Sequence, residues 1–313
     1  MKKLERNGTY GNVESPAGIQ KDIEKFSELF TLGEEFSLLS PKYEEIGWLV
    51  RQLSFISLPY KNPHTNEYIR RNGNLSISIM TPTDYGGVPY GKYPRLFRIL
   101  LETEAKRTNS PDIVIGDSLG KFCELLGIEK GGKTGYLLEQ RARAFFATTF
   151  NFIYHDPTLK GKLGMPTGYD YFKPVKRFIH FWDKKNPDQK ALWDGYISLT
   201  PEYFDLITRH NKTMPIDLRI VRILKDFPLR LDIYTWLNGR FHTLKKPTLV
   251  SFEDIAAQFG SDYSRPRDMR KHFLKELKTV QTVCQDFKLD YDEKNLVLFP
   301  SQTSLKNIPN KKD

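Results

Sequence analysis

Apolar and polar residues follow the same succession of patterns in two separate stretches of the chain. Each stretch opens with apolar residues at helical spacing, in "PRLFRILLETEAKRT" and in "PLRLDIYTWLNGRFHTL". A short β-branched run follows in each, "SPDIVIG" and "KKPTLVS", and predicts a strand. Next, "DSLGKFCELLG", with Asp117 or Ser118 as its N-cap, and "FEDIAAQFG" predict second helices that end at Gly127 and Gly260.

A third helix and β-rich sequence complete each stretch. The turns "IEKGGKTG" and "SDYSRP" lead into the helices "YLLEQRARAFFATTF" and "RDMRKHFLKELKTV". The first helix precedes the aromatic-rich runs "FNFIYH", "YDYFKPVKRFIHFW" and "WDGYISL"; the second precedes "DFKLDYD" and "NLVLFPS", a hairpin turning at Glu293 and Lys294. This is the element order of a winged helix, a helix-turn-helix variant. We therefore expect an α+β fold of tandem winged-helix domains, mainly helical with β-hairpin wings; two unrelated α+β stretches are the alternative.

The remaining patterns suggest a domain plan. Residues 1–40 are expected to form a flexible N-terminal arm, with a short acidic helix around Asp22 to Phe30. Residues 41–205 would be the first winged-helix domain with extra strands, 206–302 the DNA-binding second domain, and 303–313 a polar tail. Apolar residues from Tyr43 to Phe55 predict a helix or buried segment, and "NLSISIM", after the turn "RNGN", predicts a strand.

The net charge of +10 and sequence pI of about 9.3 favour an anionic partner, nucleic acid ahead of membrane. The two cysteines, Cys123 and Cys284, cannot form a metal quartet or a disulfide framework, which is typical of a reducing cytoplasm. No stretch approaches the roughly 20 apolar residues of a membrane span. We expect a cytoplasmic protein whose partner is double-stranded DNA, with no membrane contact.

The third helix of the second stretch carries the main predicted DNA site. Helical spacing places Met269, Phe273, Leu277 and Val280 on one face and Arg267, Lys271, Lys275 and Lys278 on the other. Tyr263 and Ser264 precede this helix, and Ser264 is expected to be its N-cap, with free N–H groups for a phosphate. We expect base contacts from Arg267 and Lys271, and backbone contacts from Arg265, Arg270, Lys275 and Lys278. A solvated basic face is the alternative.

The corresponding helix of the first stretch is less basic. Leu138, Ala142, Phe145 and Thr149 are expected to face inward, and Tyr136, Gln140, Arg143 and Ala147 outward. Candidate DNA contacts here are Lys133, Thr134, Arg141 and Arg143, with Lys130 nearby. An outward face this neutral also suits a protein interface.

"GIEKGGKTG" satisfies the written pattern of a P-loop, which would make the chain a nucleotide-hydrolysing enzyme. A strand must deliver that loop, whereas here a helix precedes it. We therefore interpret it as a glycine turn before the third helix, with Lys133 near a phosphate. The six scattered histidines lack the metal-binding pair of a rolling-circle initiator, and a metal-dependent nuclease using the carboxylates of "FEDIAAQFGSDY" is a minor alternative. The residues predict no catalytic group, no metal site and no cofactor.

Two long stretches resemble plasmid-encoded RepA replication initiators. They are "GVPYGKYPRLFRILLETEAKRTNSPDIVIGDSLGKFCELLGI" followed by "GGKTG", and "MPIDLRIVRILKDFPLRLDIYTWLNGRFHTLKKPTLVSFEDIAAQFGSDYSRPRDMRKHFLKEL", and the likeness spans about residues 85 to 300. The resemblance implies a bacterial protein, associated with nucleoid or plasmid, that binds repeated sequences (iterons) at a plasmid origin, opens adjacent DNA and recruits the host helicase or its loader. It also implies a homodimer in one state.

A tandem winged-helix transcriptional regulator would share the fold but bind a single palindromic operator instead of direct repeats. A purely structural protein would show little salt dependence of DNA binding.

Overall fold

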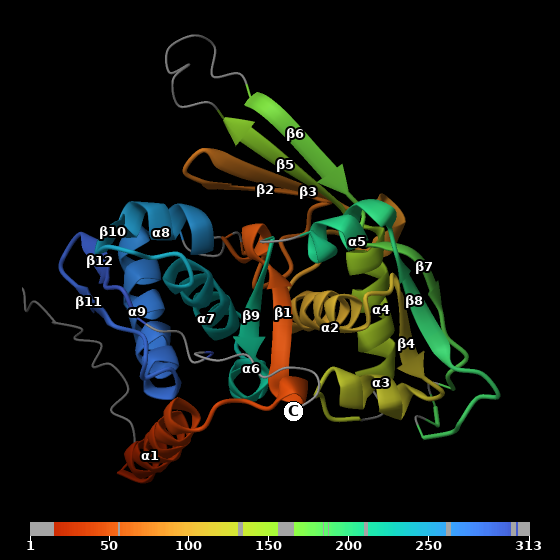
Figure 1. Cartoon of the computed structure of the whole chain (residues 1–313), viewed down its shortest axis with the longest axis horizontal. Coiled ribbons are helices and arrows are strands. Elements are labelled where there is room, and N and C mark those ends of the chain that lie inside the picture. The colour runs from red at the N-terminus through yellow and green to blue at the C-terminus, as the bar shows by residue number, and fades with distance from the viewer. Residues whose placement is uncertain are drawn as a thin grey trace, which may run out of the picture.

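The computed structural model describes residues 16–55, 57–130, 134–155, 166–183, 185–186, 188–209, 212–260, 264–301 and 305. These residues form two units of helices and strands on either side of a central strand pair (Figure 1). The fold is mixed α and β, as expected.

The first unit contains the helices and strands expected for the first stretch. Its elements are α2 (Lys92–Thr108), β4 (Asp112–Gly116), α3 (Leu119–Leu125), α4 (Thr134–Ala147), β7 (Val175–Ile179) and β8 (Gly195–Leu199). The three strands form an antiparallel sheet in the order β4-β8-β7. The hairpin strands β7 and β8 therefore return to β4 across a long intervening sequence.

The second unit repeats this arrangement. Its elements are α7 (Pro228–Phe241), β10 (Thr248–Ser251), α8 (Phe252–Phe259), α9 (Pro266–Val283), β11 (Leu289–Tyr291) and β12 (Asn295–Leu298). The sheet order β10-β12-β11 matches that of β4-β8-β7, with the last strand of the unit in the middle of each sheet. The repeat inferred from element order is thus also a repeat of strand topology.

Serine N-caps set the starts of the short helices α3 and α8, whereas the glycines that follow these helices differ in backbone conformation. Ser118 caps α3 by accepting from the Lys121 N–H at 3.3 Å, and Ser251 caps α8 by accepting from the Asp254 N–H at 3.0 Å. Gly127 follows α3 with φ +62°, a left-handed conformation that glycine adopts easily. Gly260 ends α8 with φ −82°, so the expected left-handed ending is found only in the first unit.

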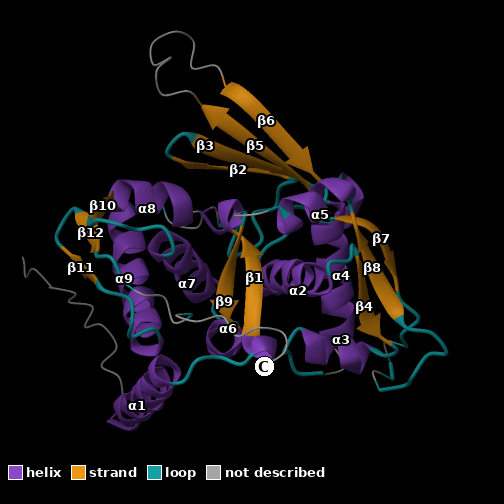
Figure 2. Ribbon diagram, in the orientation of Figure 1, coloured by secondary structure: helices purple, strands orange, loops and turns teal. Residues whose placement is uncertain are grey.

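A four-stranded sheet combines two strands that precede the first unit with two that lie between α4 and β7. It consists of β2 (Glu67–Asn72), β3 (Leu75–Met80), β5 (Thr149–His155) and β6 (Pro166–Phe172), in the order β2-β3-β5-β6 (Figure 2). The expected strand "NLSISIM" is β3, and Gly73, with φ +58°, forms the turn before it. The aromatic-rich sequence after α4 therefore divides between two sheets, β5 and β6 here and β7 and β8 beside β4.

A two-stranded sheet joins the halves of the chain. In it, β1 (Ile46–Val50) pairs antiparallel with β9 (Thr213–Asp217), Ile46 lying opposite Asp217. Of the two alternatives expected for Tyr43–Phe55, a helix or a buried segment, the second is found, because this segment is a buried strand between two short 3-10 helices, Tyr43–Glu45 and Arg51–Phe55. Strand pairing across the chain overrode the helical spacing. The short helices α5 (Pro201–Thr208) and α6 (Leu218–Leu224) flank β9 in sequence.

The region expected to be an arm contains a long helix. Helix α1 (Pro16–Leu38) extends well beyond the expected Asp22 to Phe30 and packs along the C-terminal half of α9. A Cβ at Gly33 would stand 2.2 Å from the Thr282 carbonyl oxygen, so only glycine allows this close approach. Gln285 Nε2 donates to the Phe30 carbonyl at 3.0 Å. Residues 1–15 of the expected arm, and most of the expected tail, lie outside the described residues.

Each unit has an aromatic core, and a buried ion pair links the two. Phe97, Phe122 and Phe145 pack together in the first unit, and Trp236, Phe259 and Phe273 in the second. The Arg95 guanidinium on α2 donates to both carboxylate oxygens of Asp232 on α7, at 2.7 and 2.6 Å. Cys123 and Cys284 are both free and buried.

One carboxyl group lies in the interior of the first unit. Glu102 on α2 is fully buried and accepts hydrogen bonds from the Tyr203 hydroxyl, at 2.7 Å, and from the Val50 N–H. Arg98 Nε stands 3.3 Å from its Oε1. Burial outweighs these lowering influences and raises the pKa of Glu102 to about 7.

Candidate nucleic-acid interface

Helix α9 presents a basic face to solvent. Met269, Phe273, Leu277 and Val280 are buried, as expected from their spacing. The four basic side chains assigned to the opposite face, Arg267, Lys271, Lys275 and Lys278, are exposed. The 3.6-residue period therefore correctly assigned the inward and outward faces of α9.

The start of α9 differs from the expected one. Arg265, not Ser264, is the N-cap, and its carbonyl accepts from the N–H groups of Asp268, at 3.1 Å, and Met269, at 3.2 Å. Pro266 takes the first helical position, which its fixed φ favours, and so sets the boundary one residue later than Ser264 would. Ser264 and Arg265 are exposed beside this end of the helix. Tyr263 lies outside the described residues.

Two of the six predicted basic contacts bind their own chain. Arg270 Nη2 donates to the Asp292 carbonyl at 2.9 Å, and its guanidinium lies 4.7 Å from the centre of the Phe252 ring. Lys278 Nζ lies 5.8 Å from the centre of the Phe26 ring on α1. By contrast, Arg265, Arg267, Lys271 and Lys275 form no ion pair with any described residue. The basic face is thus open along the N-terminal half of α9 and bordered by α1 beyond it.

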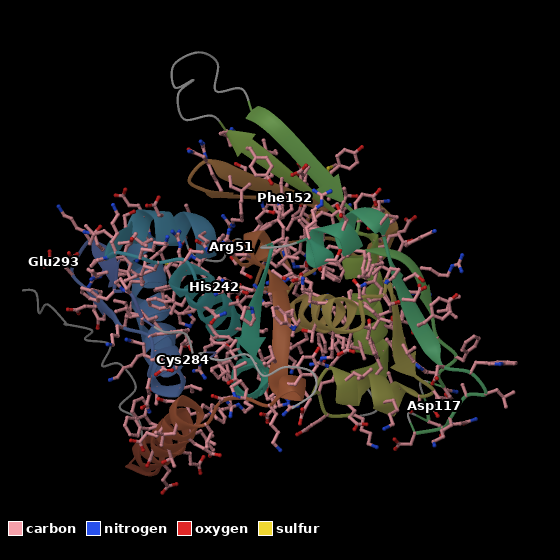
Figure 3. All side chains as sticks on the ribbon, viewed as in Figure 1. Arg51, Asp117, Phe152, His242, Cys284 and Glu293 are labelled. Atoms are coloured by element: carbon pink, nitrogen blue, oxygen red, sulfur yellow. The ribbon has the colours of Figure 1, made fainter. Side chains whose placement is uncertain are left out.

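The β11–β12 hairpin beside α9 has a net negative charge near its tip, where Asp290, Asp292 and Glu293 outnumber Lys294. Asp292 accepts from the backbone N–H groups of Lys294 and Asn295, both at 2.7 Å, and these bonds lower the pKa of its carboxyl group. Glu293 extends from the outer edge of this unit (Figure 3). A negative hairpin tip would repel phosphates, so the positive surface of this unit is concentrated on the helix.

Helix α4, the counterpart of α9, offers fewer open charges. Thr134 begins the helix, and Lys133 lies outside the described residues. Arg141 turns inward, where its guanidinium lies 3.8 Å from the centre of the Tyr90 ring and donates to the Tyr90 hydroxyl. Arg143 is 65% exposed, with Nε 3.3 Å from Glu139 Oε1. Tyr136 and Gln140 are exposed and Leu138, Ala142 and Phe145 buried, as expected, but Thr149, expected on the inward face, lies beyond the end of α4 and begins β5.

The glycine turn follows a helix, as the sequence indicated. Helix α3 ends at Leu125, and Lys225 Nζ donates to the carbonyl of Gly127. Asp232, in the "LRLD" sequence, lies on a helix and pairs with Arg95. Gly131, Gly132 and Lys133 themselves lie outside the described residues. The surroundings that a P-loop needs, a strand before the loop, are therefore missing from the described part of this region.

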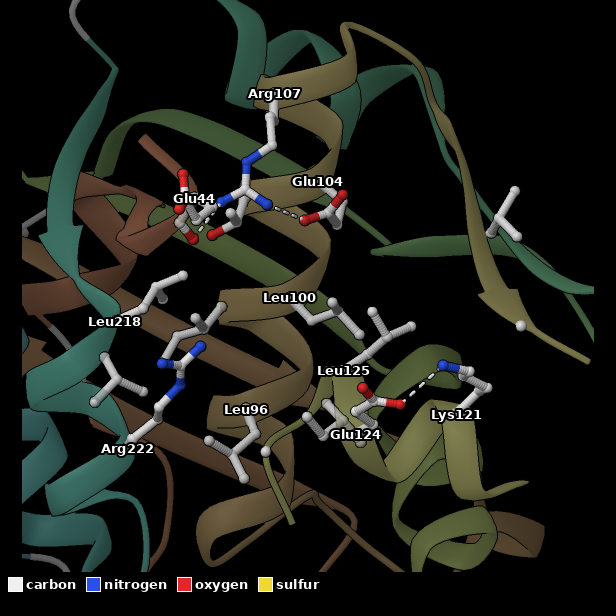
Figure 4. A pocket seen from close by; sticks show the side chains of 17 residues that line it. Glu44, Leu96, Leu100, Glu104, Arg107, Lys121, Glu124, Leu125, Leu218 and Arg222 are labelled. Carbon is white, nitrogen blue, oxygen red and sulfur yellow. Dashed lines mark hydrogen bonds and ion pairs between the residues drawn. The ribbon is translucent and has the colours of Figure 1, made fainter. Parts of the chain in front are cut away.

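A cavity of about 520 Å3 lies between α2, α3 and α6 (Figure 4). Leucines such as Leu96, Leu100 and Leu125 line its interior. At its rim, Arg107 pairs with Glu104 at 2.7 Å and Lys121 with Glu124 at 3.1 Å. The described residues that line it include no serine, cysteine or histidine. Among the described residues, no three His, Cys, Asp or Glu side chains are placed to hold a metal.

Sequence reasoning missed one group of exposed side chains. Phe181 and Trp193 were assigned to strand-like runs, but they lie with Leu192 in the loop between β7 and β8. The available signal was the polar sequence "DKKNPDQK" between the two aromatic runs, because proline and asparagine are typical of a loop. No helix in the described part of the chain is long and apolar enough to span a bilayer.

Comparisons with known proteins give one family and a set of similar structures. The family described as plasmid-encoded RepA protein matches residues 88–251. No curated protein matches the chain. A crystal structure of a selenomethionine derivative of domain 2 and domain 3 of RctB is similar, with TM-score 0.50 and 9% identity, over 79% of this chain and 95% of that chain. A second crystal structure of RctB domains 2 and 3 gives TM-score 0.49 and 10% identity, over 80% and 96%. At such low identity, this likeness concerns the fold alone.

Proposed function

Because the chain belongs to the family of plasmid-encoded RepA proteins, we propose that it is a plasmid replication initiator. It binds repeated sequences, iterons, at the plasmid origin, promotes local opening of the DNA and recruits host replication proteins such as the helicase or its loader. It forms a homodimer in one state. It works in the bacterial cytoplasm, associated with the plasmid or nucleoid, without a cofactor and without being an enzyme.

The open basic face of α9 carries this proposal. In each unit, the third helix follows a helix and a turn, and a hairpin pairs with the unit's first strand. We interpret both units as winged helices, with α9 as the helix that enters the major groove. An exposed helix face with Arg267, Lys271 and Lys275 supports this role, because such side chains bind base edges and phosphates.

The contacts of the side chains suggest which residues bind bases and which bind phosphates. Arg267 and Lys271, in the first two turns of α9, read bases, while Arg265 and Lys275 bind phosphates on either side. Arg270 contributes to the site by fixing the hairpin against α9 through Asp292. In the first unit, Arg143 and Thr134 are at the surface of α4, and Arg141 holds Tyr90. Ser264 lies just ahead of Arg265 and can donate to a phosphate.

Footprinting of the purified full chain on the DNA that flanks its own gene tests the proposal. The titration uses moderate salt and excess nonspecific competitor DNA, since phosphate contacts alone give nonspecific binding. We expect evenly spaced protection of direct repeats beside an A·T-rich stretch. Protection of a single inverted repeat would replace the initiator with a transcriptional regulator. An absence of specific protection would contradict DNA reading by α9 altogether.

A further inference from the structure

The loop that joins β7 to β8 exposes a cluster of large apolar side chains. Leu192 is 88% exposed, Trp193 68% and Phe181 50%. Folding normally removes such side chains from water, and a cluster of them at the surface marks a binding site more often than isolated ones do. We call Phe181, Leu192 and Trp193 the loop cluster.

The inner side of this loop is fixed to the first unit. Trp182 packs on Phe122 of α3, with ring centres 4.9 Å apart, and stacks on His180 at 4.7 Å. The Ala191 N–H donates to the Asp117 carbonyl at 2.8 Å. In the sequence Phe181, Trp182, the two rings therefore take opposite roles, one displayed and one anchored. Because the loop is anchored close to both ends of the cluster, its members are held in place before any ligand arrives.

The cluster has the shape of a stacking surface. The centres of the Phe181 and Trp193 rings are 6.1 Å apart and their planes are inclined by 54°. The two rings are too strongly inclined to stack flat on each other, and Trp193 is 68% exposed, so much of the indole surface is open to a flat ligand. Leu192, next to Trp193, extends the apolar surface.

The same loop carries exposed lysines, and most of its carboxylates have partners within the chain. Lys185 and Lys190 are exposed in the same loop, and Lys190, whose Nζ lies 4.0 Å from Asp117 Oδ2, keeps 77% of its side chain exposed. Asp183 accepts from the Lys185 N–H and from Asn186 Nδ2, both at 2.7 Å, and so builds the turn. Asp188 pairs with Lys130 at 2.6 Å, which leaves Asp194 as the exposed carboxylate next to Trp193. A nucleic-acid strand binds surfaces that combine exposed ammonium groups with open aromatic rings, phosphates to the cations and bases to the rings.

We propose that the loop cluster binds unpaired DNA bases, with Trp193 as the stacking surface and Lys185 and Lys190 holding neighbouring phosphates. This inference rests on the proposed function and assigns the unpaired strand to a particular site. A base inside a duplex has both faces covered by its neighbours, whereas an unpaired base can offer a face to the indole. The duplex belongs to α9, whose open side chains are cationic rather than aromatic.

Titration of the full chain with three labelled probes tests the assignment. The probes are an origin repeat as a perfect duplex, the same duplex joined to an unpaired A·T-rich stretch, and an oligothymidine single strand. The test variant is Trp193→Ala, which removes an exposed ring and leaves the anchor Trp182 in place. The matched control is Tyr171→Ala, which removes a ring that is 72% exposed on β6, in the four-stranded sheet. Trp193→Phe keeps a stacking ring.

We expect Trp193→Ala to weaken binding of oligothymidine about tenfold, in the range known for loss of one stacked base. Binding of the perfect duplex should stay unchanged, and Tyr171→Ala and Trp193→Phe should resemble the wild type on all probes. Oligothymidine should also quench tryptophan fluorescence in the wild type, and much less in Trp193→Phe.

Other outcomes would contradict either the role of the loop cluster or the proposed function. Unchanged oligothymidine binding by Trp193→Ala overturns the inference, as does an equal loss on the perfect duplex. A change in sedimentation of the DNA-free protein, with DNA binding intact, would make the cluster a protein interface instead. A wild-type chain that binds none of the probes would overturn the proposed function itself, not merely the role of the loop.

Discussion

The two units share one topology and present different chemistry to solvent. In the second unit, α9 carries open basic side chains and the hairpin tip is acidic. In the first unit, α4 is nearly neutral outside, Arg141 turns to Tyr90, and the hairpin loop displays Phe181 and Trp193. The exposed side chains that could bind a ligand thus lie on the third helix in the second unit and on the hairpin loop in the first.

This difference shows that fold and binding role are separate properties of a repeated unit. The inward residues of both third helices follow the same period, because each helix must bury one face. The outward residues are free of that constraint, so they can differ without loss of the fold. We propose that the second unit uses this freedom to bind duplex DNA through α9, and the first unit to bind an unpaired strand through the loop cluster.

The largest expected effect concerns the buried ion pair between Arg95 and Asp232, which connects the two units. Asp232→Ala leaves Arg95 buried without its carboxylate, and we expect a loss of about 3 to 5 kcal/mol in the free energy of unfolding. Urea unfolding measures it. The control Asp226→Ala breaks the more exposed pair with Lys92, at 2.5 Å, and should remove about 1 kcal/mol or less. Equal losses in the two variants would mean that the buried pair stabilises the contact between the units no more than an exposed pair does.

A second effect is a pH dependence of stability that arises from the buried carboxyl group of Glu102 in the first unit. The pKa of Glu102 is raised to about 7 from an ordinary value of 4.5, so the folded chain binds this proton more tightly than the unfolded chain. Its contribution is therefore fully present below pH 4.5 and is lost as the pH rises to about 7, on the order of 3 kcal/mol. Urea unfolding between pH 4.5 and 8 should show this slope in the wild type and a flatter one in Glu102→Gln. Parallel slopes would contradict it.

A third effect sharpens the contrast between α9 and α4. We expect Arg267→Ala to weaken binding to the specific repeat by about 1 to 3 kcal/mol and to relax the preference at one base position. Arg143→Ala, on the outward face of α4, should change specific binding little. Electrophoretic mobility shifts with a set of single-base variants of the repeat measure both. A larger loss from Arg143→Ala would reverse the roles assigned to the two helices.

The smallest effect is a change in salt dependence. Lys275→Ala should weaken binding to all sequences alike and lower the slope of log affinity against log salt by about 1. Lys130→Ala is the control in the first unit, since Lys130 is already paired with Asp188 at 2.6 Å, and its slope should match the wild type. If Lys130→Ala lowers the slope as much as Lys275→Ala does, the first unit contacts phosphates as extensively as the second.

Features of the site that depend on neighbouring residues in the sequence could be predicted, whereas contacts between distant parts of the chain could not. The open side chains Arg267, Lys271 and Lys275 could be assigned from spacing alone, because the helical period places them opposite Phe273. The inward turn of Arg141 and the contact of Arg270 with Asp292 could not, since each partner lies elsewhere in the chain. The same spacing that correctly oriented α9 left a helix and a buried segment as alternatives at β1, where pairing with β9 decides the structure.

The sequence by itself determined the order of helices and strands in both units, the buried faces of α4 and α9, and the excess positive charge, because these follow from neighbours within a few residues and from composition. Only the tertiary structure decided which strands pair. It placed β5 and β6 with β3 and returned β8 to β4, and it packed the half-buried Trp182 on Phe122 while leaving Trp193 exposed. Hydrogen bonds between distant strands and packing against α3 select among arrangements that the local pattern allows equally.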